Sequence, residues 1–131
     1  MTTERLVALF KRAYFSVSLD EDGDLCVGTD DIRRVFVIIY EDYKLLRYFA
    51  LFGLWEKASL ESKRAFVNKM NDKFNFVRFS VFEDHPNVLV ADYYLPFEEG
   101  IPAFQIVSAL RLFSRLAYRI LREYDEDDLV K

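Results

Sequence analysis

Cysteine, histidine, glycine and proline are scarce in this sequence. Its 131 residues include one Cys, one His, four Gly and three Pro. A single cysteine excludes a disulfide within the chain, and one Cys with one His argues against a zinc site built on several such ligands. No glycine-rich phosphate-binding loop is recognisable either. We therefore expect no bound metal ion and no cofactor.

An excess of positive charge and a long apolar run are also missing. The chain has 18 Lys and Arg against 22 Asp and Glu, a net charge of -4, which argues against a general nucleic-acid binder. The longest apolar runs, Val35 to Tyr40 and Tyr48 to Trp55, are far shorter than the roughly 20 residues that span a bilayer. Charges at Glu4, Arg5 and Lys11 interrupt any signal-peptide core. We expect a cytoplasmic protein that binds neither nucleic acid nor membrane.

Apolar side chains, by contrast, are abundant. Hydrophobic types make up 52% of the residues and aromatic types 17%, with 13 Phe and 8 Tyr. A chain of this length and composition has enough apolar side chain to fold around one core. We assign residues 1–131 to a single domain and expect its acidic tail, residues 125–131, to be frayed.

The spacing of apolar residues predicts an α+β fold. Helical periodicity indicates helices over residues 3–14, 59–71 and 102–124, with Thr3 and Ser59 as N-caps and Pro102 in the first turn of the last helix. Alternating or β-branched segments predict strands over residues 15–19, 25–27, 33–40, 44–54, 74–82 and 88–97, with a turn at 84–87. The element order α-β-β-β-β-α-β-β-α is typical of helices packed on an antiparallel sheet.

Three acidic residues in the first predicted hairpin superficially suggest a calcium loop. An EF-hand needs Gly at its sixth position and Glu at its twelfth, whereas counting from Asp20 places Gly23 fourth and Asp31 twelfth. A hairpin tip, at which glycine supplies a positive φ, accounts better for Asp20, Asp22 and Asp24. Weak ion binding by these carboxylates is the alternative.

No set of reactive side chains is recognisable. His85 stands beside Asp84 in a predicted turn, with no nucleophile expected nearby. Cys26 lies on a predicted strand without a basic neighbour, as a packed apolar residue would. Asn68 and Asn71 mark the expected end of the second helix, where Asn suits a C-cap. We name no catalytic residue and predict that the chain is not an enzyme.

Four arginines share one stripe of the last predicted helix. Arg111, Arg115, Arg119 and Arg122 follow one another at steps of four, four and three. They form either a solvated face opposite the apolar stripe or a basic ridge that contacts an anion.

Arg78 is a further candidate for anion contact, because it lies on a predicted strand between Val77 and Phe79. A guanidinium on a sheet face needs a carboxylate or water as its partner. We expect Glu98 or Glu99 to supply the carboxylate.

The two central predicted strands are apolar on both faces. Residues 35–40 and 48–55 hold more apolar side chain than three helices can readily cover, and an uncovered patch of this kind marks an interface. Tyr40, Tyr48, Phe52 and Trp55 are the expected partner-binding residues. The alternative is that the helices and the first hairpin cover all of this surface.

Several segments of the chain together resemble the YbjN-domain proteins, a bacterial family described as sensory transduction regulators. The segments that carry the likeness are Asp20–Leu25, Leu45–Arg47, Val67–Asn71, Phe74, Val77–Val81 and Leu95–Ile101. The resemblance implies a fold similar to the type III secretion chaperones, in which helices pack on one face of a twisted antiparallel sheet and two subunits often pair. It implies no established enzymatic activity and no catalytic residues to carry over.

Two functions are compatible with these observations. The first is a non-enzymatic binding module, a homodimer that captures a segment of a partner protein on an apolar sheet or dimer surface. The second is a sensor of a small anionic ligand, with Arg78, Arg111, Arg115 and Arg119 as the anion contacts.

Overall fold

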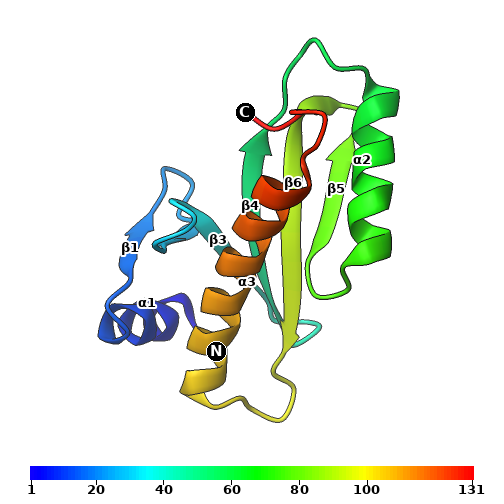
Figure 1. Cartoon of the computed structure of the whole chain (residues 1–131). Coiled ribbons are helices and arrows are strands. Elements are labelled where there is room, and N and C mark those ends of the chain that lie inside the picture. Colours follow the sequence, from blue (N-terminus) through cyan, green and yellow to red (C-terminus); the bar gives the residue numbers. More distant parts are fainter.

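The fold is α+β, with three helices and one six-stranded antiparallel sheet (Figure 1). The computed structural model describes all 131 residues. In chain order the elements are α1 (Thr3–Arg12), β1 (Ser16–Leu19), β2 (Leu25–Gly28), β3 (Val35–Tyr40), β4 (Leu45–Gly53), α2 (Leu60–Lys73), β5 (Arg78–Phe82), β6 (His85–Pro96) and α3 (Ala103–Tyr124). The strands lie in the order β1-β2-β3-β4-β6-β5. The predicted fold class and element order are confirmed.

All three helices pack on the same face of the sheet. Along β4 the side chains of Leu46, Tyr48 and Ala50 are fully buried, whereas those of the alternating residues are half-buried or exposed. Because successive strand residues point to opposite faces, this pattern identifies one covered face and one bare face. The contacts of α1 with β1, of α2 with β5 and of α3 with β6 all lie on the covered side, as the arrangement in Figure 1 indicates.

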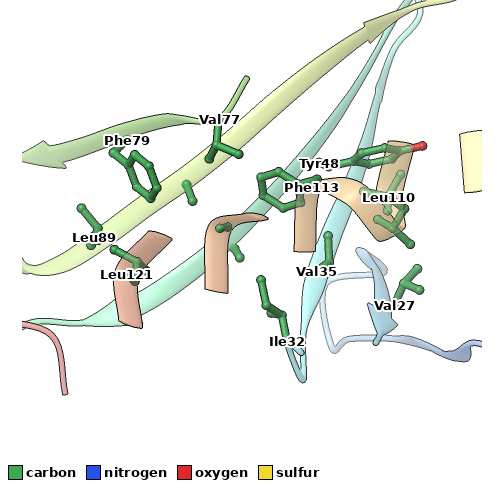
Figure 2. Close-up of a cluster of buried hydrophobic side chains, with 14 of the residues drawn as sticks. Val27, Ile32, Val35, Tyr48, Val77, Phe79, Leu89, Leu110, Phe113 and Leu121 are labelled. Atoms are coloured by element: carbon green, nitrogen blue, oxygen red, sulfur yellow. The ribbon is translucent and has the colours of Figure 1, made fainter. Parts of the chain in front are cut away.

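The core lies between this covered face and the helices. Figure 2 shows Tyr48 beside Leu110 and Phe113 of α3, with Phe79 and Leu89 further along the sheet and Val77 just before β5. The rings of Tyr48 and Phe113 are 6.5 Å apart, and the Tyr48 hydroxyl donates a 2.9 Å hydrogen bond to the carbonyl oxygen of Ile106. Burial raises the pKa of the Tyr48 phenol far above its ordinary value.

None of the helices is both long enough and apolar enough to cross a membrane. The longest, α3, has an apolar stripe that includes Ile106, Leu110 and Phe113, and arginines on its outer side. This division of the helix surface is typical of a helix that covers a sheet.

Several boundaries differ from those that the sequence predicts. The N-cap of α1 is Thr2, whose Oγ1 accepts from the backbone N–H of Arg5 at 3.2 Å, and the helix ends at Arg12. Pro102 is the N-cap of α3 and precedes its first turn. The spacing of apolar side chains cannot fix helix ends, because the first and last turns are held by capping contacts.

The second hairpin differs more. Residues 74–77 do not pair as a strand; instead Phe76 stacks on Tyr93 with ring centroids 4.4 Å apart, and Phe74 meets the ring of Tyr124 at 5.1 Å. The alternating aromatics therefore anchor a connection. At the other end, the predicted turn at 84–87 is shorter, since His85 already pairs with Phe82 as the first residue of β6.

The acidic tail is not frayed, in contrast to the prediction. The Asp125 carboxylate accepts hydrogen bonds from the backbone N–H groups of Leu129 at 2.8 Å and Val130 at 2.9 Å. Leu129 is buried, and Val130 forms a β-bridge with Leu54. The nine-residue β4 extends past the six-residue β3, and the tail pairs with the edge that β3 leaves open.

Asn71 does not cap α2, which continues to Lys73. Its side chain bonds to both backbone groups of Phe79 on β5: Nδ2 donates to the Phe79 carbonyl at 2.8 Å, and Oδ1 accepts from the Phe79 N–H at 2.9 Å. Since β5 is an edge strand, the Asn71 amide takes the place that a neighbouring strand would fill. This contact blocks strand addition at Phe79, the second residue of β5.

We expect Asn71→Ala to lower the free energy of unfolding by about 2 kcal/mol, because both backbone groups of Phe79 lose a partner. Urea denaturation followed by circular dichroism measures the loss. The matched control is Asn68→Ala, since Asn68 is exposed on the same helix and forms no side-chain hydrogen bond. Equal stability of the two variants would contradict the assigned role of Asn71.

Candidate functional site

The bare face of the sheet is the candidate functional site, and we call it the open face. It consists of the residues of β3, β4, β5 and β6 that point away from the helices. The register places on it Phe36, Ile38, Tyr40, Leu45, Arg47, Phe49, Leu51, Arg78, Ser80, Val88, Val90, Asp92, Tyr94 and Pro96. We include the exposed Phe82, which adjoins them at the end of β5 beyond a shift in register. The register places these residues together, because Phe36 pairs with Phe49, Phe49 with Asp92, and Asp92 with Arg78.

Aromatic side chains stack in pairs across the open face. The rings of Phe36 and Phe49 are 4.9 Å apart and nearly parallel, and those of Tyr40 and Tyr94 are 6.3 Å apart. Cross-strand aromatic pairs of this kind stabilise a sheet. They also present flat apolar surface to whatever contacts this face.

A cluster of three charged residues lies at the centre of the open face. Asp92 is only 1% exposed and accepts hydrogen bonds from two arginines. The Arg47 Nη2 is 2.9 Å from Asp92 Oδ2, and the Arg78 Nη2 is 2.8 Å from the same oxygen. Arg47 also lies over the Phe49 ring at 4.5 Å. The cluster fixes the charges within an aromatic surround.

The electrostatics of this cluster favour a net positive centre. Hydrogen bonding to Asp92 raises the pKa of Arg78, although desolvation opposes it. Burial disfavours the charge of Arg47, yet its bonds with Asp92 raise the pKa of that guanidinium as well. Two cations therefore share one carboxylate, and one positive charge is left in excess. The Arg78 side chain is 60% exposed and carries this charge to the surface.

Exposed apolar side chains flank the charged cluster. Leu51 on β4 is 49% exposed, and Phe82 on β5 is 51% exposed. Monomeric proteins seldom leave such side chains together on one sheet face without a partner. The open face thus combines apolar area with a central charge.

The four predicted partner-binding residues separate in the structure. Tyr40 lies on the open face, whereas Tyr48 is in the core and is not available to a partner; its prediction as a surface anchor is wrong. Phe52 points to the helix side and packs partly buried against the core. Trp55 follows β4 and is 41% exposed, with the ammonium groups of Lys57 and Lys131 near its ring.

The predicted anion contacts do not form one site. Arg78 lies on the open face, and its partner is Asp92, not Glu98 or Glu99. The other three candidates lie on α3, on the opposite side of the sheet. There Arg111 donates to the Ala13 carbonyl at 3.2 Å and covers the Phe15 ring, Arg119 is 3.9 Å from Glu123, and Arg115 is exposed. Arg122 contacts the Tyr118 hydroxyl.

The acidic hairpin has the structural role that its spacing indicates. Asp20 Oδ1 accepts from the backbone N–H groups of Asp22 at 3.0 Å and Asp24 at 2.8 Å, and Gly23 has a φ of 82°. The three carboxylates lie within 4.8 Å of one another at the surface. The hydrogen bonds within the loop account for this arrangement.

The other two candidate reactive groups, His85 and Cys26, lie in ordinary structural positions on strands β6 and β2. His85 is exposed at the start of β6. Cys26 is buried, and desolvation raises the pKa of its thiol. Arg34 lies close to this thiol and opposes the shift, so the expectation of no basic neighbour is wrong. A buried thiol of raised pKa is a poor nucleophile.

Asp92 was missed by the sequence analysis, although a signal for it existed. It is the one charged residue in the apolar run from Val88 to Leu95, where a carboxylate needs a partner. The partners come from positions 14 and 45 residues away, which the local pattern does not reveal.

Comparison with known proteins identifies the family. A family model described as YbjN, "Putative bacterial sensory transduction regulator", matches residues 2–126. The chain belongs to the YbjN family. No curated protein sequence gives a significant match to this chain. The family description concerns regulation and names no reaction.

Solved structures show the same fold. YbjN from E. coli superposes with a TM-score of 0.81 at 14% identity, covering 100% of this chain and 96% of that one. An uncharacterized protein from Methanothermobacter thermautotrophicus gives 0.66 at 14% identity, with coverage of 98% and 99%. A chain of the HopA1-SchA chaperone-effector complex gives 0.56 at 15% identity, with coverage of 88% and 91%. The YbjN fold is thus similar to that of a secretion chaperone complex, as the resemblance implies.

Proposed function

We propose that this YbjN-family chain is a non-enzymatic protein-binding module, and that its open face takes a segment of a partner protein. One observation carries the proposal: a six-stranded sheet has helices on one face only, and its other face bears stacked aromatics around a charged cluster. The similarity to a chain of a chaperone-effector complex supports a role of this kind.

The chemistry of the open face indicates what the partner segment contributes. Apolar side chains of the partner pack over Leu51, Phe82 and the ring pair of Phe36 and Phe49, and this burial supplies the main driving force. An acidic side chain pairs with the exposed guanidinium of Arg78, which balances the excess positive charge. The preferred partner is therefore an apolar segment that carries an acidic residue.

A second copy of this chain is the other candidate occupant of the open face. Such pairing would give the homodimer that the sequence analysis expects. Size-exclusion chromatography with light scattering separates the two occupants. A dimer that becomes a monomer when the open face is altered would assign this face to self-association.

The experiment uses Leu51→Glu and Phe82→Glu, which place a carboxylate on the open face at exposed positions. The tagged chain is incubated with lysate of its own host, and captured proteins are identified by cross-linking and mass spectrometry. We expect both variants to reduce the captured partner at least tenfold, because a buried unpaired carboxylate opposes docking. The cross-links of the unaltered chain should map to β3, β4 and β5.

Leu19→Glu and Tyr118→Glu are the matched controls, since both side chains are exposed but lie outside the open face. They should retain the partner. Equal loss in the controls, or full capture by Leu51→Glu and Phe82→Glu, would refute the open face as the binding surface.

A further inference from the structure

A groove lies between α1 and the beginning of α3, away from the open face. Its volume is about 870 Å³, and most of its lining residues are apolar. Leu6 and Leu9 of α1, Ile101 of the loop before α3, and Phe104 and Val107 of α3 supply much of this lining. Figure 1 shows α1 beside the N-terminal end of α3, where these elements converge.

Two arginines lie along the α1 side of the groove. Arg5 and Arg12 are both lining residues, are both exposed, and form no ion pair within the chain. They are seven residues apart, which is about 10 Å along a helix and on the same side of it. Ala8 lies between them, and its small side chain leaves the middle of the groove open.

The remaining charges in the lining do not cancel these arginines. Glu41 and Lys44 pair with each other, so they add no net charge. Glu98 is the only other acidic residue of the lining. Counting side chains alone, the groove therefore combines an apolar interior with one positive charge in excess, and the Met1 ammonium, also in the lining and close enough to act on Glu41, adds a second.

We propose that this groove binds a small amphiphile with one anionic head group and one apolar chain. The head group pairs with Arg5 or Arg12, and the chain lies against Leu9, Ile101 and Val107. The groove volume is within the range of small-molecule sites, roughly 300–1,000 Å³, which favours such a ligand over a docked protein. The site goes beyond the proposed function and does not depend on it, because it shares no residue with the open face.

Isothermal titration calorimetry of the full chain tests the site, with decanoate as the first probe at concentrations below micelle formation. We expect saturable one-to-one binding that tightens about fourfold for each added methylene from octanoate to dodecanoate. Decyl phosphate should also bind, and its affinity relative to decanoate tells whether the site prefers a phosphate or a carboxylate head group. Decanol and decyltrimethylammonium, which lack the anionic head, should bind at least tenfold more weakly.

Variants then locate the site. Arg5→Gln with Arg12→Gln should weaken decanoate at least tenfold. The charge-matched control is Lys11→Gln with Arg64→Gln, because these exposed cations lie on α1 and α2 outside the groove. Ala8→Trp fills the groove at an exposed position and should abolish binding while leaving the folded state intact.

Four outcomes would overturn the proposal. The first is the absence of any saturable heat with decanoate, and the second is decanol binding as tightly as decanoate. The third is unchanged affinity in the Arg5 and Arg12 double variant. The fourth is association with anionic vesicles in the absence of monomer binding. Because Leu51→Glu does not touch this groove, it should leave decanoate binding unchanged whether or not partner capture is lost.

Discussion

Tyr48→Ala is expected to destabilise the chain by about 4 kcal/mol, the largest effect of any change considered for this protein. Tyr48 is fully buried, its ring contacts that of Phe113, and its hydroxyl bonds to the Ile106 carbonyl. Alanine would leave a cavity between β4 and α3. Urea denaturation followed by circular dichroism measures the loss.

Tyr40→Ala is the matched control, because Tyr40 belongs to the open face of the neighbouring strand β3. It should cost no more than about 1.5 kcal/mol, the value of an aromatic pair on a half-buried surface. Comparable losses for the two tyrosines would contradict the assignment of the covered and bare faces.

Tyr48→Phe separates packing from ionisation. It should cost about 1 kcal/mol at neutral pH, because one hydrogen bond is lost. The folded-state pKa of Tyr48 is raised, so its stabilisation is complete below the ordinary phenol value of about 10 and is lost as the pH rises above it. The Phe variant should therefore lose less stability than the unaltered chain above pH 10. An unchanged alkaline slope would count against this assignment.

Asp92→Asn is expected to destabilise the chain by about 3 kcal/mol. Asp92 is almost fully buried and is the shared acceptor of Arg47 and Arg78. Asparagine keeps the size but removes the charge, so the Arg47 guanidinium, which is only 18% exposed, loses its counter-ion. The contribution of Arg78 is smaller because water screens its exposed side chain. Thermal and urea unfolding measure the difference.

Asp72→Asn is the control for Asp92→Asn, since Asp72 is exposed on α2 and forms no ion pair.

A further variant replaces the whole cluster, with Asp92→Leu, Arg47→Met and Arg78→Met. It should recover most of the lost stability, because apolar residues of similar volume can replace a buried ion group. This variant should fold. If the proposed function holds, it should no longer prefer a partner segment that carries an acidic residue. A neutral effect of Asp92→Asn would show that the cluster does not hold its charges.

The helices and strands follow from local patterns, but the faces of the sheet do not. In β3 and β4 nearly every residue is apolar, so alternation gives no indication of which side the helices cover. The register decides it: Tyr48 lies opposite Val37 on the covered side, whereas Tyr40 lies opposite Leu45 on the bare side. Two tyrosines of similar sequence context therefore have opposite roles.

Long-range contacts explain the other errors. Glu98 and Glu99 are plausible partners for Arg78 in sequence terms, but β6 pairs Asp92 directly with Arg78 across the ladder. The tail reads as polar and exposed, yet Leu129 packs in the core and the following residues pair with β4. Asn71 reads as a cap because its partner, Phe79, becomes visible only when α2 lies against β5.

The sequence by itself determined the α+β class, the element order and the scarcity of cysteine and histidine, because periodicity and composition are local properties of the chain. It also predicted two central strands that are apolar on both faces, with the extent of their covering left open. The tertiary structure alone decided which residues form the open face, which carboxylate joins the two arginines, and where the groove between α1 and α3 lies. These depend on strand register and helix placement, which bring together residues far apart along the chain.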